Sequence, residues 1–163
     1  MKIENLNDLF LHTLQDIYFA EKQIVKALPK IMKKTDSPEL GKAFESHLAE
    51  TEEQVTRLEQ VFEMLGEKPK ATKCPAIEGI IEEANELIAD IQDPDTRDAG
   101  MIAAAQAVEH YEITRYGTLV SWAELLGMKD AAKVLGQTLK EEYGADQKLT
   151  KLAESRLNKE AAE

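Results

Sequence analysis

The chain has 163 residues, 31 of them acidic and 20 basic, which gives a formal net charge of −11. This length is typical of one domain with its own hydrophobic core. An acidic surface repels phosphate backbones and anionic lipid, so we expect no binding to nucleic acids or membranes. The single cysteine, Cys74, excludes an internal disulfide and any cysteine-rich metal site. We find neither a leader-like apolar segment nor an apolar stretch of about 18 residues, and therefore expect a cytoplasmic protein.

Apolar residues recur at spacings of three and four along most of the chain, whereas strictly alternating runs are missing. This pattern predicts an all-α protein. The first helix is predicted over residues 6–34, with Asn5 or Asn7 as its N-cap. The second is predicted over 38–65, where Ser37 is the N-cap and a proline occupies the first helical position.

A long connection follows, and it contains a shorter helix predicted over residues 75–91. The third long helix is predicted over 94–126, beginning at the N-cap Asp93, and the fourth over 129–158. Four long amphipathic helices with one long crossover in the middle are typical of the ferritin-like four-helix bundle. We therefore predict a single ferritin-like domain over residues 1–163.

The informative charged residues are acids that fall on the apolar faces of these helices. Their positions follow from the rotation of an α-helix by about 100° per residue. In the third long helix Glu109 and Glu112 straddle the apolar line, each within roughly 40° of it. In the fourth, Glu142 and Asp146 lie within roughly 20° of the centre of the apolar face. Glu21 lies within roughly 50° of the centre in the first helix. All five carboxylates are therefore predicted to point inward.

The second helix is less regular. His47 and Gln54 flank its apolar stripe, Glu50 lies beyond the edge at roughly 100° to 120°, and Glu53 faces nearly the opposite way. We therefore favour Glu50 over Glu53 as the site residue of this helix. His47 is a candidate ligand, although a single histidine on an apolar face is more often part of the core.

Several buried carboxylates require compensation, because each uncompensated anion in a core costs several kcal/mol. Lysine and arginine are nearly absent from the same faces, which leaves protons or a multivalent cation. Oxygen ligands with few imidazoles favour iron, manganese or magnesium, and carboxylates on four helices can bridge two ions. Considered alone, each pair of acids is more simply interpreted as part of a solvent-exposed surface. Tyr116, one turn after Glu112, is interpreted as core packing, with a hydrogen bond to a ligand as the alternative.

The segments 47–54, 73–79 and 103–117 resemble the YciE/YciF family of bacterial stress-response proteins, and the resemblance covers essentially the whole chain. The family's biochemical activity is not established. The resemblance implies a ferritin-like fold related to rubrerythrin, a helical dimer and a dinuclear metal centre. It implies these ligands, in chain order: Glu21, Glu50, the pair Glu109 and Glu112, and Glu142.

The chain departs from the ferritin-like pattern at two places where that pattern has a histidine. Glu53 stands at the first place, and Ala145 and Asp146 stand near the second. His47, Gln54, Glu53 and Asp146 are therefore the alternatives for completing the second metal position. The chain has no four-cysteine electron-transfer module, so electrons would come from a partner or a small reductant.

These observations predict a di-metal carboxylate protein with two ions per chain, iron in preference to manganese, that oxidises Fe(II) with O2 or H2O2 as a homodimer. In this hypothesis Glu50 and Glu142 bridge the ions, and Asp146 or His47 completes or tunes the site. The alternative is a structural or interaction protein in which the metal only stabilises the bundle. Iron storage is a third hypothesis, and it would require a hollow shell of many subunits.

Overall fold

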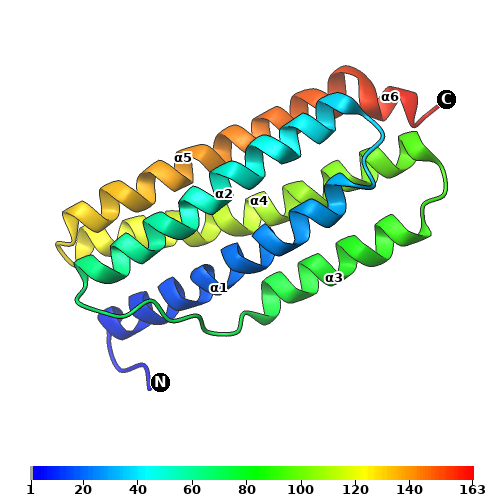
Figure 1. Cartoon of the computed structure of the whole chain (residues 1–163). Helices are drawn as coiled ribbons and strands as arrows, with labels where there is room; N and C mark the ends of the chain where they lie inside the picture. The colour runs from blue at the N-terminus through cyan, green and yellow to red at the C-terminus, as the bar shows by residue number, and fades with distance from the viewer. Residues whose placement is uncertain (1) are drawn as a thin grey trace.

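The computed structural model describes residues 2–163. Four long helices lie side by side and form two helical hairpins (Figure 1). A shorter helix, α3 (Pro75–Asp90), lies within the crossover that joins the two hairpins. The helices are α1 (Leu6–Met32), α2 (Pro38–Met64), α3 (Pro75–Asp90), α4 (Pro94–Leu125) and α5 (Lys129–Leu152). In each hairpin the two long helices run antiparallel, and α3 packs against α1 and α4. The prediction of an all-α, ferritin-like four-helix bundle is confirmed.

Local capping chemistry sets the ends of the long helices. Asn5, Ser37 and Asp93 each accept a hydrogen bond from the backbone N–H three residues further on, at 3.0, 3.3 and 2.7 Å. These bonds satisfy amides that the first helical turn leaves free. After α2 and α4 the chain turns at Gly66 and Gly127, whose φ angles of 71° and 77° favour glycine.

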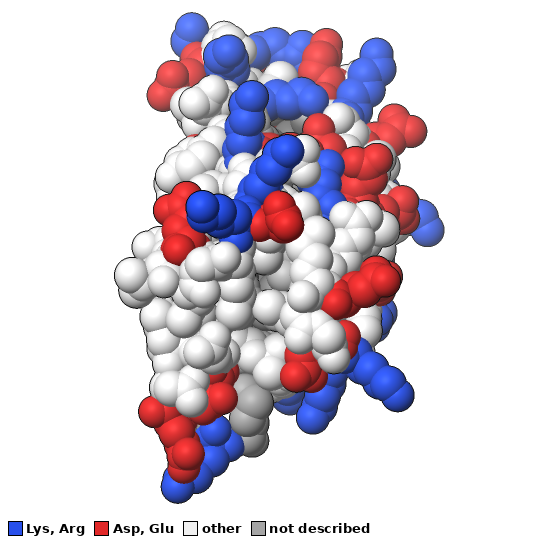
Figure 2. Space-filling view, turned by 90° about the vertical axis from the view of Figure 1, so that its left-hand side faces the viewer, with Lys and Arg blue, Asp and Glu red and all other residues white. Residues whose placement is uncertain are grey.

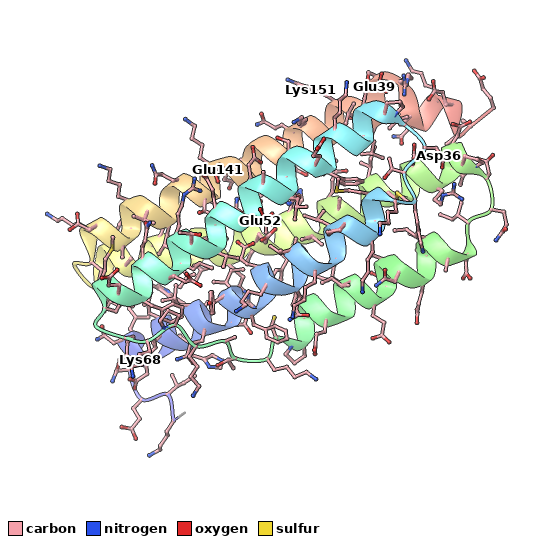
Figure 3. The ribbon with its side chains drawn as sticks, in the orientation of Figure 1. Asp36, Glu39, Glu52, Lys68, Glu141 and Lys151 are labelled. Atoms are coloured by element: carbon pink, nitrogen blue, oxygen red, sulfur yellow. The ribbon has the colours of Figure 1, made fainter. Side chains whose placement is uncertain are left out.

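The last helix differs from its predicted extent of 129–158. The α-helix ends at Leu152, and a π-helical turn, Ala153–Leu157, precedes the short helix α6 (Asn158–Glu160). The wider turn accompanies two contacts: Leu157 is buried in the core, and Arg156 donates hydrogen bonds to Ser37 Oγ and Glu39 Oε2, both at 3.1 Å. Figure 3 shows Glu39 at this end of the bundle. The C-terminal segment is thereby tied to the start of α2.

The core runs the length of the bundle and draws on every long helix and on α3. Its largest fully buried side chains include Phe10, Phe62, Ile77, Met101 and Tyr116. Among the described residues, we find no helix with the combination of length and apolarity that crossing a membrane requires.

Candidate metal centre

Five of the predicted site residues lie in the interior. Glu21, Glu112 and Glu142 have no exposed surface, Glu109 is 1% exposed and His47 is 8% exposed. Each long helix contributes at least one of them, and Glu109 and Glu112 follow one another by one turn of α4. The helical period predicts the inward orientation of the four glutamates, and all four are buried; His47, predicted only to flank the apolar stripe, is buried too, whereas Asp146, also predicted to point inward, is only partly buried.

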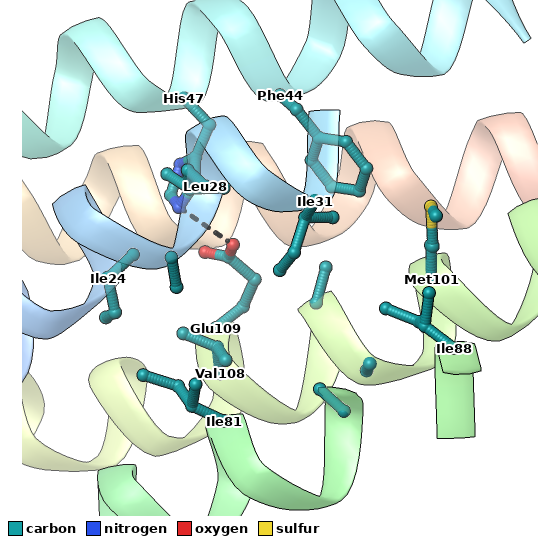
Figure 4. A pocket seen from close by; sticks show the side chains of 14 residues that line it. Ile24, Leu28, Ile31, Phe44, His47, Ile81, Ile88, Met101, Val108 and Glu109 are labelled. Carbon is teal, nitrogen blue, oxygen red and sulfur yellow. Dashed lines mark ion pairs between the residues drawn. The ribbon is translucent and has the colours of Figure 1, made fainter. Parts of the chain in front are cut away.

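Four of these residues form one compact group. His47, Glu109, Glu112 and Glu142 each offer a ligand atom, and these atoms all lie within 4.8 Å of one another. His47 Nε2 is 3.1 Å from Glu109 Oε1, the pair joined by the dashed line in Figure 4, but the two atoms do not meet with hydrogen-bond geometry. Both oxygens of Glu112 and of Glu142 also have no hydrogen-bond partner among the described protein atoms. Because buried polar atoms are nearly always paired in native proteins, these unpaired atoms indicate a candidate site for a bound ligand.

Burial and mutual repulsion control the charge of the group. Removal from water is the main cause, followed by neighbouring carboxylates, and the pKa rises to about 8 for Glu21 and to about 7 for Glu142. The pKa of Glu109 and of Glu112 also rises well above the ordinary value, mainly because both are buried. Burial lowers the pKa of His47 to about 4, and Lys148 adds to this. Among residues 2–163 no lysine or arginine is buried, so only protons or an added cation can neutralise these glutamates.

Tyr116 supports the group from α4. It is completely buried, and its hydroxyl donates a hydrogen bond to Glu21 Oε1. Both interpretations of this residue therefore hold, since it packs in the core and also contacts a predicted ligand. The hydrogen bond fixes one oxygen of Glu21 and leaves its Oε2 without a partner.

Gln54 is the second polar residue that α2 turns inward. It is completely buried, its Nε2 donates to Glu141 Oε2 at 3.2 Å, and its Oε1 has no partner. Glu141 also accepts a 2.6 Å hydrogen bond from Arg57 Nη1. The spacing of residues along the chain does not reveal this role of Glu141, because its partners are more than 80 residues away.

Glu50 does not belong to the compact group. It is partly exposed and lines a pocket between α2 and α5 together with Glu141 and Lys148, and His47 and Glu109 lie in the wall of the same pocket. Figure 3 shows Glu141 on α5. Partial burial and Glu141 raise the pKa of Glu50. Its position beyond the edge of the apolar stripe explains why Glu50 stands at the polar mouth of the centre rather than inside it.

Two other predicted alternatives lie nearer the surface. Asp146 Oδ1 accepts a 3.0 Å hydrogen bond from Gln106 Nε2 and lies 3.2 Å from Nε2 of the exposed His110. Glu53 is exposed and forms a 3.1 Å ion pair with Arg57. The structure therefore does not bring Asp146 or Glu53 into the compact group. Of the other two alternatives, His47 belongs to the group and the buried Gln54 lies near it.

Comparison with known proteins places the chain in a family. A family model described as "Domain of unknown function (DUF892)" matches residues 5–162. Protein YciF of Escherichia coli (strain K12) is 49% identical over 162 residues, which cover 99% of this chain and 98% of that protein. The chain belongs to the YciF family, DUF892.

Solved structures agree with this assignment. The crystal structure of the E. coli stress protein YciF is 49% identical with a TM-score of 0.92, and the match covers 96% of this chain and 99% of that one. A Rhodopseudomonas palustris structure, "YcfI, a putative structural protein", is 50% identical with a TM-score of 0.90, and the match covers 91% of this chain and 95% of that one. A Xanthomonas campestris protein at 23% identity shares the fold, with a TM-score of 0.72.

The arrangement in this YciF-family chain has a definite chemical capacity. Three carboxylates and one imidazole converge in an interior without buried lysine or arginine. Carboxylate oxygens with imidazole nitrogen suit divalent iron, manganese or zinc, and a cation satisfies atoms that otherwise have no partner. The buried cluster can hold a metal ion.

Proposed function

We propose that this YciF-like stress protein is a dinuclear metal carboxylate protein that binds two ions per chain, iron in preference to manganese, and oxidises Fe(II) with O2 or H2O2. The observation that carries the proposal is the set of unpartnered ligand atoms on Glu109, Glu112, Glu142 and His47, buried together with no cationic side chain among them. The donor set fits iron because it is dominated by carboxylates and completed by imidazole.

The neighbours of each residue support a division of roles. His47 and Glu109 would hold one ion, and Glu21, beside Tyr116, would hold the other. Glu112 and Glu142 both interact electrostatically with Glu21, and both also lie in the compact group with Glu109. Glu112 and Glu142 would therefore help to hold both ions, and Glu112 would take the place that the sequence alone assigned to Glu50.

The protein's own contribution is to hold ions and protons in a water-poor interior. In the metal-free protein the buried glutamates retain protons, and the binding of ions would release those protons. Tyr116 keeps Glu21 oriented through its hydrogen bond. When bound, two Fe(II) ions would supply two electrons, which together with two protons reduce one H2O2 to two water molecules or one O2 to one H2O2.

Anaerobic titration tests the proposal. Protein stripped of metal is titrated with Fe(II) and then with H2O2, and we expect two Fe(II) bound per chain and one H2O2 consumed for every two Fe(II) oxidised. Glu112→Gln should lose at least one of the two ions. Glu124→Gln, an exposed position on the same helix, is the matched control and should bind both. Absence of iron binding by the unaltered protein, or full binding by Glu112→Gln, contradicts the proposal.

The name of the R. palustris relative favours a second candidate, in which the ion only stabilises the bundle. This structural hypothesis predicts that added metal raises the melting temperature, because the ion binds only the folded state. It also predicts no consumption of oxidant. The same titration therefore separates the two candidates.

A further inference from the structure

A second pocket reaches the same centre from another side. It lies between α1, α3 and α4, with Phe44 and His47 of α2 at its inner wall (Figure 4). Twelve of its fourteen lining residues are apolar, and the two exceptions are His47 and Glu109. Two residues of the candidate metal centre therefore form one end of an otherwise apolar chamber, and His47 has no hydrogen-bond partner at either ring nitrogen.

The chamber is large enough for a small molecule. Its volume is about 40 Å³, whereas a single water needs roughly 10–15 Å³. Water would find few partners there, since three or so polar contacts are what keep a buried water in place. Apolar pockets of this kind accept uncharged apolar ligands.

Short side chains create this space, and α3 covers it. Ala84 of α3 and Ala104 and Ala105 of α4 face the chamber, and none of the three side chains extends beyond Cβ. Ile81 and Ile88 contribute the rest of the cover from α3. The extra helix of the crossover thus separates the His47–Glu109 edge from solvent on this side.

The pocket between α2 and α5 offers the opposite environment. Its mouth carries Glu50, Glu141 and Lys148, and it also ends at His47 and Glu109. The centre is therefore approached through one charged pocket and one apolar pocket, which meet at the same pair of residues.

We propose that the apolar chamber is the binding site for dioxygen, and that ions and hydrogen peroxide reach the centre through the charged pocket instead. Dioxygen is small, uncharged and apolar, so it gives up few favourable interactions with water when it enters the chamber. Hydrogen peroxide would lose its hydrogen bonds to water and gain none from the alkyl walls. The use of bound dioxygen as an oxidant rests on the proposed function. The binding of an apolar molecule in the chamber does not depend on metal or turnover.

Xenon is the probe that tests binding on its own. Crystals of the metal-free protein pressurised with xenon should show one xenon atom between α1, α3 and α4. Ala84→Leu should abolish that site, whereas Ala89→Leu, at an exposed position of the same helix, should retain it. Ala104→Leu fills the chamber from α4 and serves as an independent variant if Ala84→Leu does not fold. A chamber without xenon in the unaltered protein, or a filled variant that still binds it, overturns the proposal.

A second arm tests the route. In iron-loaded protein, Ala84→Leu should slow oxidation by O2 severalfold relative to Ala89→Leu, with the same iron stoichiometry and the same rate with H2O2. Equal slowing with both oxidants would overturn the separation of routes. If the unaltered protein binds xenon but oxidises no Fe(II), the proposed function fails while the apolar site stands.

Discussion

At the scale of single residues, the buried glutamates are defined by what neutralises them. Glu21, Glu109, Glu112 and Glu142 are each almost or completely without exposed surface, and an uncompensated anion in such a place costs several kcal/mol. Burial raises the pKa of each, so in the metal-free protein protons supply the compensation. Cations can replace those protons, so the same residues that weaken the metal-free bundle at high pH also enable it to hold a metal ion.

Tyr116 gives the first prediction at this scale. Tyr116→Phe removes the only hydroxyl that pairs with Glu21 Oε1 among the described residues, leaving a buried oxygen unpaired. We expect the free energy of unfolding of the metal-free protein to fall by about 1–3 kcal/mol in urea titrations. Tyr143→Phe, on the half-exposed Tyr143 of α5, is the control and should change stability little. Equal stability of the two variants would show that the hydrogen bond contributes nothing.

The sequence predicts the orientation of these residues because orientation follows from helical period alone. Each acid within roughly 50° of an apolar line, apart from Asp146, is buried. Asp146 is only partly buried and contacts Gln106 and His110 instead, and such contacts between helices have no signature in the spacing of one helix. The contacts of Glu141 with residues of α2 likewise have no such signature.

At the scale of the helices, the starts were predictable and some of the contacts between helices were not. Asn5, Ser37 and Asp93 cap through bonds to residues three positions away, so a short stretch of sequence contains the whole signal. The π-helical turn at Ala153–Leu157 depends on what the end of α5 packs against. Asp98 belongs to the same class: it is 1% exposed, and its partners are more than 60 residues away.

Asp98 supports the second prediction. Its carboxyl group accepts hydrogen bonds from the backbone amides of Asp36 and Ser37, at 3.0 and 2.6 Å, and so joins α4 to the start of α2. Asp98→Asn can accept only one of the two bonds and turns an NH2 group toward the other amide. We expect a loss of about 2–3 kcal/mol in unfolding free energy, measured by urea denaturation.

Asp90→Asn, at an exposed position of α3, is the matched control for this change and should alter stability by less than about 0.5 kcal/mol. A loss confined to Asp98→Asn would identify the buried amide contacts as its cause. If both variants unfold at the same urea concentration, the link between α4 and α2 is not a source of stability.

At the scale of the whole molecule, charge and architecture act together. The net charge is −11, yet on the face shown in Figure 2 acidic and basic side chains are interspersed rather than separated into two fields. The interior differs, because its glutamates lie among no buried basic side chains in residues 2–163. The buried glutamates of α1, α4 and α5 therefore have no buried basic side chain to pair with, which favours an internal cation.

This arrangement predicts an unusual pH dependence for the metal-free protein. The folded pKa of Glu21 is about 8 and that of Glu142 about 7, both raised from 4.5. The folded state therefore binds more protons than the unfolded state above pH 4.5, and the stability these groups contribute is lost as pH rises toward 8. His47 acts oppositely between about 4 and 6.5, since its pKa is lowered. The clear window is therefore pH 6.5–8.

In that window we expect the melting temperature of metal-free protein to fall, with a loss of about 1.4 kcal/mol per pH unit for each excess proton held by the folded state. Glu21→Gln cannot ionise, so it should lose less stability than the unaltered protein between pH 6.5 and 8. Saturation with Mn(II) should reverse the trend, because metal binding releases protons and strengthens as pH rises. Calorimetric melts of both proteins at pH 6.5, 7.2 and 8, with and without Mn(II), provide the measurement. A melting temperature that rises with pH in the absence of metal would mean that these carboxylates are neutralised by something other than protons.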